Sequence, residues 1–146
     1  MPKHHEIKQL PYTPDQLFQV VLDVEKYPEF LPWCTAARIN TKTANSINAD
    51  LVIGYKMFRE KFTSVVTFDH PDEVRVSYED GPFKYLRNIW KFSPVEVEGK
   101  AGAEIDFFVD FEFKSGLLQA AIQPVFSKAV FKMIQSFESR AAELYS

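Results

Sequence analysis

Apolar and polar positions alternate with a period of two in the middle of the chain, and with a helical period near both ends. Between residues 36 and 113 turn-forming residues interrupt the alternation at five places. The clearest stretch is residues 104–113, where apolar side chains share one face and mostly acidic side chains share the other. Such alternation is typical of strands with one buried and one solvated face. The pattern therefore predicts an antiparallel meander of about six strands.

Two segments carry the signals of helices. Thr13-Pro14-Asp15-Gln16 has the pattern of a capping box with proline at the first helical position, and apolar residues follow at helical spacing. A second apolar stripe begins after Gly116 and runs to the C-terminus, which predicts a long amphipathic helix. Pro124 lies inside this stripe, so we expect a kink or a short preceding turn, with the main helix starting near Gln123. Residues 6–10 alternate weakly and are expected to form a first strand.

The segment from Tyr27 to Trp33 holds two prolines among four large apolar side chains. Proline disfavours a regular helix, so we expect an apolar loop. Two interpretations stay open. The loop either packs into the domain as a hydrophobic plug, or it is a gate and interfacial anchor, because Tyr and Trp suit boundaries between apolar and polar surroundings. Both interpretations place it at the mouth of a cavity.

The order of elements predicts an α+β fold. A curved antiparallel sheet that wraps around the long C-terminal helix would bury both apolar faces. Any mismatch between the two surfaces leaves a cavity, and 14 Phe, 6 Tyr and 2 Trp indicate that its lining is apolar. No linker and no internal repeat divides the sequence, so residues 1–146 are expected to form a single domain.

Composition excludes several classes of protein. With 46% hydrophobic and 25% charged residues, neither a disordered chain nor a coiled coil is expected. No apolar run approaches the ~18 residues of a membrane span, and the first residues lack the apolar stretch of a secretory signal, so we expect a cytoplasmic protein. The net charge of −3 argues against DNA as a partner. The single cysteine, Cys34, gives no internal disulfide and is expected to be a small, half-buried hydrophobe.

Candidate catalytic and metal-binding residues are few. The only histidines are His4, His5 and His70, and we expect all three at the surface, away from any nucleophile. His4 and His5 lack the i, i+4 spacing that directs two imidazoles at one ion, and Cys34 has no CxxC partner. Five glycines form no phosphate-binding loop. We therefore expect no enzyme, no metal site and no catalytic cofactor.

Two groups of basic residues are candidates for contact with a partner. One lies at an expected hairpin and consists of Lys56, Met57, Phe58, Arg59 and Lys61. The other lies along a later strand and consists of Lys84, Arg87 and Lys91. One interpretation of both groups is scattered surface charge that contacts no partner. The alternatives are RNA and anionic lipid headgroups, since headgroups favour a basic tip that also carries apolar side chains. The first group, with Tyr27, is the expected membrane or partner contact.

Four blocks of the sequence, in this order, resemble the coenzyme Q-binding START-domain family over essentially the whole chain. They are Asp23–Cys34, then Ala49–Lys56 with Phe62–Ser64, then Gly81–Leu86 with Trp90, Phe92 and Pro94, and finally Phe111–Ser115. The resemblance implies a helix-grip fold, meaning a curved antiparallel sheet around a long C-terminal helix. It implies one START-like lipid-binding domain that holds ubiquinone, or a similar isoprenoid lipid, as a bound ligand.

The resemblance also implies a role. Members of the family act as carriers or chaperones of ubiquinone that support respiration and quinone biosynthesis. Transient contact with a membrane surface is implied as well, at the periphery of the inner membrane of a bacterium. The lack of a transit segment before His4 is expected either of a bacterial member or of a shortened chain. Bacterial members are also similar to a ribosome-association toxin that blocks subunit joining, and the wider superfamily includes polyketide cyclases. Both alternatives stay open.

The strand faces and the helical stripe together predict the residues that bind the ligand. From the sheet we expect Leu51, Ile53, Phe62, Val66, Leu86, Asn88, Trp90, Phe107, Val109 and Phe111. From the long helix we expect Phe126, Val130 and Met133. The entrance is expected to be guarded by Phe30, Leu31 and Trp33. Asn88 is the polar residue on its inward face, and it bonds either a quinone carbonyl or the protein backbone. A register shift of one residue would invert any of these strands.

Overall fold

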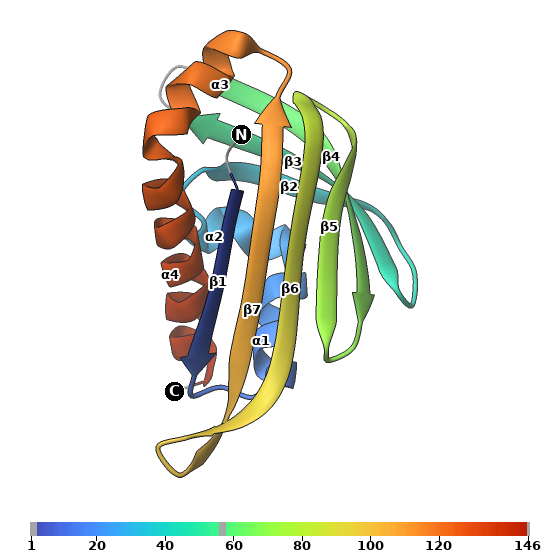
Figure 1. Ribbon diagram of the computed structural model, residues 1–146. Coiled ribbons are helices and arrows are strands. Elements are labelled where there is room, and N and C mark those ends of the chain that lie inside the picture. The colour runs from blue at the N-terminus through green and yellow to red at the C-terminus, as the bar shows by residue number, and fades with distance from the viewer. Residues whose placement is uncertain (1–2, 56–57, 146) are drawn as a thin grey trace.

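The protein consists of a curved antiparallel sheet beside a long C-terminal helix (Figure 1). The computed structural model describes residues 3–55 and 58–145. Within these residues the strands are β1 (Lys3–Leu10), β2 (Cys34–Lys42), β3 (Ser46–Tyr55), β4 (Phe58–Asp69), β5 (Glu73–Asp80), β6 (Phe83–Val97) and β7 (Lys100–Phe113). Their order across the sheet is β1-β7-β6-β5-β4-β3-β2. Strands β2 to β7 each pair with the next in sequence, so the predicted meander is confirmed.

The helical elements lie on the concave side of the sheet. They are α1 (Pro14–Leu22), the 3-10 turn η1 (Val24–Lys26), α2 (Tyr27–Phe30), α3 (Gly116–Ile122), the 3-10 turn η2 (Gln123–Val125) and α4 (Phe126–Tyr145). Pro124 lies in η2, so the short turn before the main helix is the alternative that the structure adopts. Helix α4 contacts α1, α2 and β1. In the described part of the chain, no helix is both long and apolar enough to cross a membrane.

Helix α1 fills one end of the concave face. Its capping box is present: the Thr13 hydroxyl accepts a hydrogen bond from the Gln16 amide at 3.2 Å, and the Gln16 side chain accepts one from the Thr13 amide at 2.9 Å. Such a cap contributes about 1 kcal/mol. The ring of Phe18 packs edge-on against Phe68 and Phe92, with centroids 5.7 and 6.5 Å away. A void of only about 10 Å³ is left at this end.

The prediction of a purely irregular segment after α1 is wrong for its first half. Residues Tyr27–Phe30 form one helical turn, α2. Pro28 is compatible with this turn because it lies at its N-terminal end, where a missing amide proton removes no helical hydrogen bond. The turn closes through a hydrogen bond from the Leu31 amide to the Tyr27 carbonyl at 2.8 Å.

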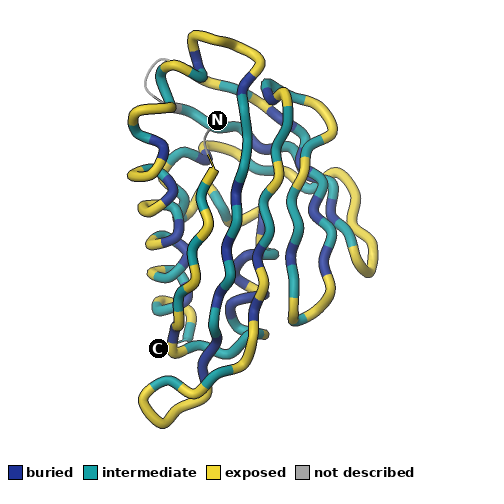
Figure 2. Tube along the Cα trace, viewed as in Figure 1, coloured by how far each residue is buried: buried dark blue, intermediate teal, exposed yellow. Residues whose placement is uncertain are grey.

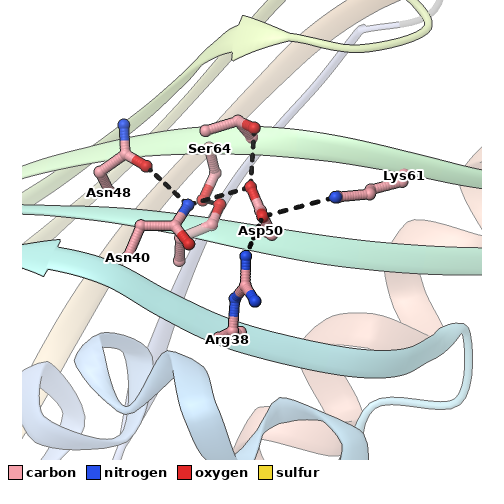
Figure 3. Close-up of polar contacts among 8 residues, drawn as sticks. Arg38, Asn40, Asn48, Asp50, Lys61 and Ser64 are labelled. Atoms are coloured by element: carbon pink, nitrogen blue, oxygen red, sulfur yellow. Dashed lines mark hydrogen bonds and ion pairs between the residues drawn. The ribbon is translucent and has the colours of Figure 1, made fainter.

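The convex face of β2, β3 and β4 carries a polar network around Asp50 (Figure 3). Its carboxylate accepts hydrogen bonds from Thr63 at 2.7 Å and Asn40 at 3.0 Å. The side-chain nitrogens of Arg38 and Lys61 lie 3.3 and 3.6 Å away. These contacts, with the Thr63 hydrogen bond as the largest, lower the pKa of Asp50. Since Asp50 faces outward, its neighbours in β3 face the core, as the alternation predicts.

Strands β5 and β6 pair along only part of their length. The ladder covers Glu73–Val76 of β5 and Asn88–Lys91 of β6. Past these positions the described residues form no further β5–β6 pairs, and the Tyr78 hydroxyl bridges the two strands instead. Its oxygen lies 2.6 Å from the Phe83 carbonyl and 2.9 Å from the Lys84 carbonyl. The sheet therefore bends at this place, and the inner face behind the bend is free to enclose space.

The turn between β5 and β6 requires glycine. Gly81 has φ +153°, and a Cβ at this position would lie 2.4 Å from the Cβ of Phe62. Only a residue without a side chain tolerates both the backbone conformation and this close approach. The turn thus brings Phe83 onto the inner face beside Phe62, with the two ring centroids 5.2 Å apart.

Candidate functional site: an apolar cavity

A cavity of about 290 Å³ lies between the inner face of the sheet and helices α3 and α4. The strands line it with Cys34, Leu51, Ile53, Gly54, Glu60, Phe62, Val76, Phe83, Leu86, Asn88, Trp90, Val109, Phe111 and Phe113. The helices and the segment after α2 line it with Tyr27, Leu31, Trp33, Leu118, Ile122, Phe126, Ala129, Val130, Met133 and Phe137. The lining is therefore almost entirely apolar, and both tryptophans of the sequence belong to it.

Two groups of aromatic rings pack in the cavity wall, one within the sheet and one between the sheet and α4. Phe83 packs against Phe62 and Phe113, with ring centroids 5.2 and 5.0 Å away. Trp90 of β6 meets Phe137 of α4 edge-on, with centroids 4.9 Å apart. Rings in such contacts have little freedom to collapse, because interiors are close-packed and side chains occupy fixed rotamers. The space between the two groups consequently stays open.

Asn88 is the neutral amide in the wall, and its hydrogen bonds go to the protein itself. Its side-chain nitrogen donates to the Phe108 carbonyl at 2.9 Å, and its side-chain oxygen accepts from the Trp90 indole nitrogen at 2.9 Å. Asn88 was expected to bond either a quinone carbonyl or the protein backbone, and the structure shows the hydrogen bond to the backbone. The same contacts fix the orientation of the Trp90 ring in the cavity wall.

The phenol and thiol in the wall hold their protons. Tyr27 donates its hydroxyl proton to the Val21 carbonyl, and burial raises the pKa of this phenol. The Cys34 thiol lies 3.5 Å from the Ala36 carbonyl, and burial raises its pKa to about 11. A thiolate is the reactive form of cysteine, so this thiol is unreactive at neutral pH. Glu60 is the acidic side chain of the wall, and it lies opposite Ile53 in the β3–β4 ladder.

Most residues predicted to bind the ligand face this cavity. They are Leu31, Trp33, Leu51, Ile53, Phe62, Leu86, Asn88, Trp90, Val109, Phe111, Phe126, Val130 and Met133. They come together because the predicted faces of β3, β4, β6 and β7 are the observed inner faces, with no shift of register. Contact of these side chains with a ligand stays a prediction.

Three of the predicted residues do not line the cavity. Phe30 packs edge-on against Phe137, with centroids 5.3 Å apart, and so belongs to the packing behind the wall. Val66 is 3% exposed and lies further along β4, inside the close-packed core. Phe107 is 1% exposed and packs against Trp90, with centroids 4.6 Å apart. Val66 and Phe107 point inward as predicted, but other side chains occupy the space beside them. Phe30, which was predicted at the entrance, packs against Phe137 instead.

The predicted partner-contact group is only partly visible. Lys56 and Met57 lie outside the described residues, and Phe58 begins β4. Arg59 is exposed, and Lys61 is exposed but pairs with the carboxylate at the centre of Figure 3. Tyr27 does not belong to this surface, because its hydroxyl is bound to the backbone of α1 and its ring lies in the cavity wall.

Sequence reasoning missed two kinds of wall residue. Some lie on faces that the periodicity identified, and they are Val76, Phe113, Leu118, Ile122, Ala129 and Phe137. Others lie at strand ends or next to turns, where the periodicity carries no signal, and they are Cys34, Gly54, Glu60 and Phe83. The first kind could have been found from the same pattern. The second kind depends on where strands end in three dimensions.

The sequence matches a family whose description includes lipid transport, which agrees with an apolar cavity. The model of the family described as "Polyketide cyclase / dehydrase and lipid transport" matches residues 10–138. The chain belongs to this family. Within it, the chain is 39% identical over 141 residues to the ribosome association toxin RatA of Rickettsia prowazekii (strain Madrid E), covering 94% of each protein. It is 30% identical over 144 residues to the mitochondrial coenzyme Q-binding protein COQ10 homolog B of Xenopus laevis, covering 98% of this chain and 59% of that protein.

The fold is shared with solved structures of the START superfamily. A START superfamily protein from Mycobacterium smegmatis superposes with a TM-score of 0.80 at 14% identity, and the match covers 97% of this chain and 98% of that one. The predicted helix-grip arrangement is thus confirmed. The description of the family covers lipid transport as well as cyclases and dehydrases.

Proposed function

We propose that the protein binds ubiquinone, or a similar isoprenoid quinone, in the apolar cavity and carries it without converting it. The observation that carries the proposal is a cavity of about 290 Å³ whose amide, phenol and thiol groups already hydrogen-bond to the protein. A ligand held there binds mainly through apolar contact, and Glu60 is the charged exception in the wall. The similarity to a coenzyme Q-binding protein supports a quinone as that ligand.

The volume of the cavity sets the part of the ligand that it holds. An enclosed apolar cavity of about 150 Å³ binds a benzene molecule. A cavity of about 290 Å³ therefore takes the quinone ring and roughly one isoprene unit, and the rest of a long tail extends outside. A dry void costs about 24 cal/mol per Å³, so leaving this one empty would cost on the order of 7 kcal/mol. Bound quinone should therefore stabilise the fold.

The wall lacks the arrangement that a cyclase needs. General acid–base catalysis requires a group that exchanges its proton near the working pH. Burial raises the pKa values of Tyr27 and Cys34, which keeps both protonated. Among the wall residues in 3–55 and 58–145, Glu60 is the carboxyl group, and the others offer it no histidine, lysine or second carboxyl group as a partner. Turnover of a polyketide by the purified protein would contradict the carrier proposal.

Titration with quinones of increasing tail length tests the proposal. Trp33 and Trp90 both face the cavity, so quenching of intrinsic fluorescence reports binding. Each buried isoprene unit supplies at most about 4 kcal/mol at ~0.8 kcal/mol per carbon, or up to about 1000-fold in affinity. We expect a large gain for the first unit and little gain for later ones. The Trp33→Phe variant, in which Trp90 alone reports, is the control. Equal affinities for all tail lengths would contradict binding in the cavity.

Association with the ribosome is the second candidate function. It is supported by the relative named ribosome association toxin, which matches this chain at higher identity than the coenzyme Q-binding relative does. Sedimentation of the protein with large ribosomal subunits at low and high salt tests it. Binding through phosphates weakens steeply with salt, so a bound fraction that disappears at high salt supports this function. No bound fraction at low salt would dispose of it.

A further inference from the structure

Two of the basic residues singled out in the sequence, Lys61 and Lys84, are paired with carboxylates of neighbouring strands, whereas Arg59 and Lys91 form no ion pair with any residue in 3–55 or 58–145. Lys61 pairs with Asp50 at 3.6 Å, and Lys84 pairs with Glu112 of β7 at 2.8 Å. The guanidinium group of Arg87 lies over the ring of Phe108, 5.7 Å from its centroid. These side chains therefore offer less free positive charge to a partner than the sequence suggests.

Further unpaired positive charge is found just before α3 and on the first half of α4. Residues 113–137 contain three lysines and no acidic residue, in a chain of net charge −3. These lysines are Lys114, Lys128 and Lys132, all exposed. None of the three forms an ion pair with any residue in 3–55 or 58–145. They form a local basic surface on an acidic protein.

The same two helices expose large apolar side chains. Leu117 of α3 is 74% exposed and Phe131 of α4 is 59% exposed. Lys128, Phe131 and Lys132 follow at i, i+3 and i+4, so they share one face of α4. Figure 2 shows exposed positions recurring along the outer side of α3 and α4. We name Leu117, Lys128, Phe131 and Lys132 the helical docking face.

The cavity lies directly behind this face. Leu118 is adjacent to Leu117 and lines the cavity, and Met133 is adjacent to Lys132 and lines it too. The helices therefore present one side to the cavity and the other to solvent. A surface that meets the docking face would touch the elements that enclose the ligand.

We propose that the helical docking face binds the surface of a membrane that contains anionic phospholipids, so that quinone passes between bilayer and cavity. The inference rests on the proposed carrier function. Lysines beside exposed Leu and Phe side chains match such a surface, because headgroup phosphates attract the ammonium groups while apolar side chains enter the acyl boundary. An RNA surface would use the lysines and its unpaired bases stack on rings such as Phe131, but it offers no acyl layer for the aliphatic Leu117.

Flotation with lipid vesicles tests the inference. Wild-type protein should bind vesicles of phosphatidylcholine with phosphatidylglycerol and should bind pure phosphatidylcholine weakly. Each lysine near an anionic surface supplies about 1 kcal/mol, so Lys128→Gln with Lys132→Gln should weaken binding about 30-fold. Leu117→Ser with Phe131→Ser should weaken it at least about ten-fold.

Matched variants elsewhere serve as controls. Lys42→Gln with Lys100→Gln removes two exposed lysines from strand ends, and Ile7→Ser with Leu144→Ser removes apolar side chains that are 57% and 48% exposed. Both controls should bind vesicles like the wild type. Equal losses in controls and docking-face variants would overturn the inference. A loss from the lysine pair without one from the apolar pair would also overturn it and would favour a polyanion such as RNA.

Quinone titration without vesicles separates this inference from the proposed function. Every variant should bind short-tail quinone like the wild type, since none of the substituted side chains lines the cavity. Wild-type protein that binds quinone but no vesicles would overturn the docking inference alone. Wild-type protein that binds vesicles but no quinone would overturn the carrier function and, with it, the transfer role given to the docking face.

Discussion

Filling about half of the cavity should weaken quinone binding without harming the fold. Ala129 of α4 lines the cavity, and Ala129→Phe adds a ring there. A cavity of about 150 Å³ holds one benzene ring, so the new side chain would occupy roughly half of the 290 Å³. Filling that volume at about 24 cal/mol per Å³ sets an upper limit of about 4 kcal/mol on the gain in stability. We expect unchanged or higher stability and at least a ten-fold weaker affinity.

Two measurements on the same protein check this prediction. Urea unfolding gives the free energy of unfolding, and tryptophan quenching by a short-tail quinone gives the affinity. Ala120→Phe is the matched control, because Ala120 lies on α3 and is exposed. This control should bind quinone like the wild type and unfold at the same urea concentration.

The result that would refute the reasoning is also defined. If Ala129→Phe lowers the free energy of unfolding by more than about 2 kcal/mol, the ring is clashing with a packed core and the space is not available. If the variant is stable but binds quinone with wild-type affinity, the ligand does not enter between the sheet and α4. Either outcome removes the physical basis of the carrier proposal.

Two further predictions concern polar groups of the wall. Asn88→Leu should lower the free energy of unfolding by about 1–3 kcal/mol, because it leaves the Phe108 carbonyl and the Trp90 indole without their hydrogen-bond partner. Quinone affinity should change little. Urea unfolding and quinone titration measure the two quantities, and a loss of affinity without a loss of stability would refute this prediction. Alkylation of Cys34 should accelerate about ten-fold per pH unit up to about pH 11, its raised pKa, whereas the unfolded chain levels off above about pH 8.5. Because the folded thiol keeps its proton to higher pH than the unfolded one, the free energy of unfolding should fall as the pH rises from about 8.5 to about 11. An alkylation rate of the folded protein that levels off near pH 9 would contradict the burial of Cys34.

Much of the fold follows from periodicity because each strand has one buried face. Residues 104–113 illustrate this: a shift by one position would expose five apolar side chains, so only one register is stable. The capping box at Thr13 is equally local, since both of its hydrogen bonds lie within four residues of the chain. Such features depend on neighbours in sequence and can be predicted from it.

Features that depend on strand ends and cross-strand partners could not be predicted. Phe83 enters the cavity wall because a register irregularity between Phe83 and Tyr85 puts it on the same face as Leu86, and because Gly81 allows a close approach to Phe62. Lys84 resembles a free basic residue until Glu112 is placed beside it by the β6–β7 register. Pro28 argued against helix, yet a single turn tolerates proline in its first positions. In each case the deciding contact comes from another element or from an exact element boundary.

Nuclear Overhauser effects between unlabelled quinone and methyl-labelled protein test the central claim most directly. The account predicts contacts from the quinone to Leu51, Ile53 and Val130, whose methyl groups belong to side chains that line the cavity from the sheet and from α4. Contacts confined to exposed methyl groups such as those of Ile7 and Leu144, with none to these three, would contradict it.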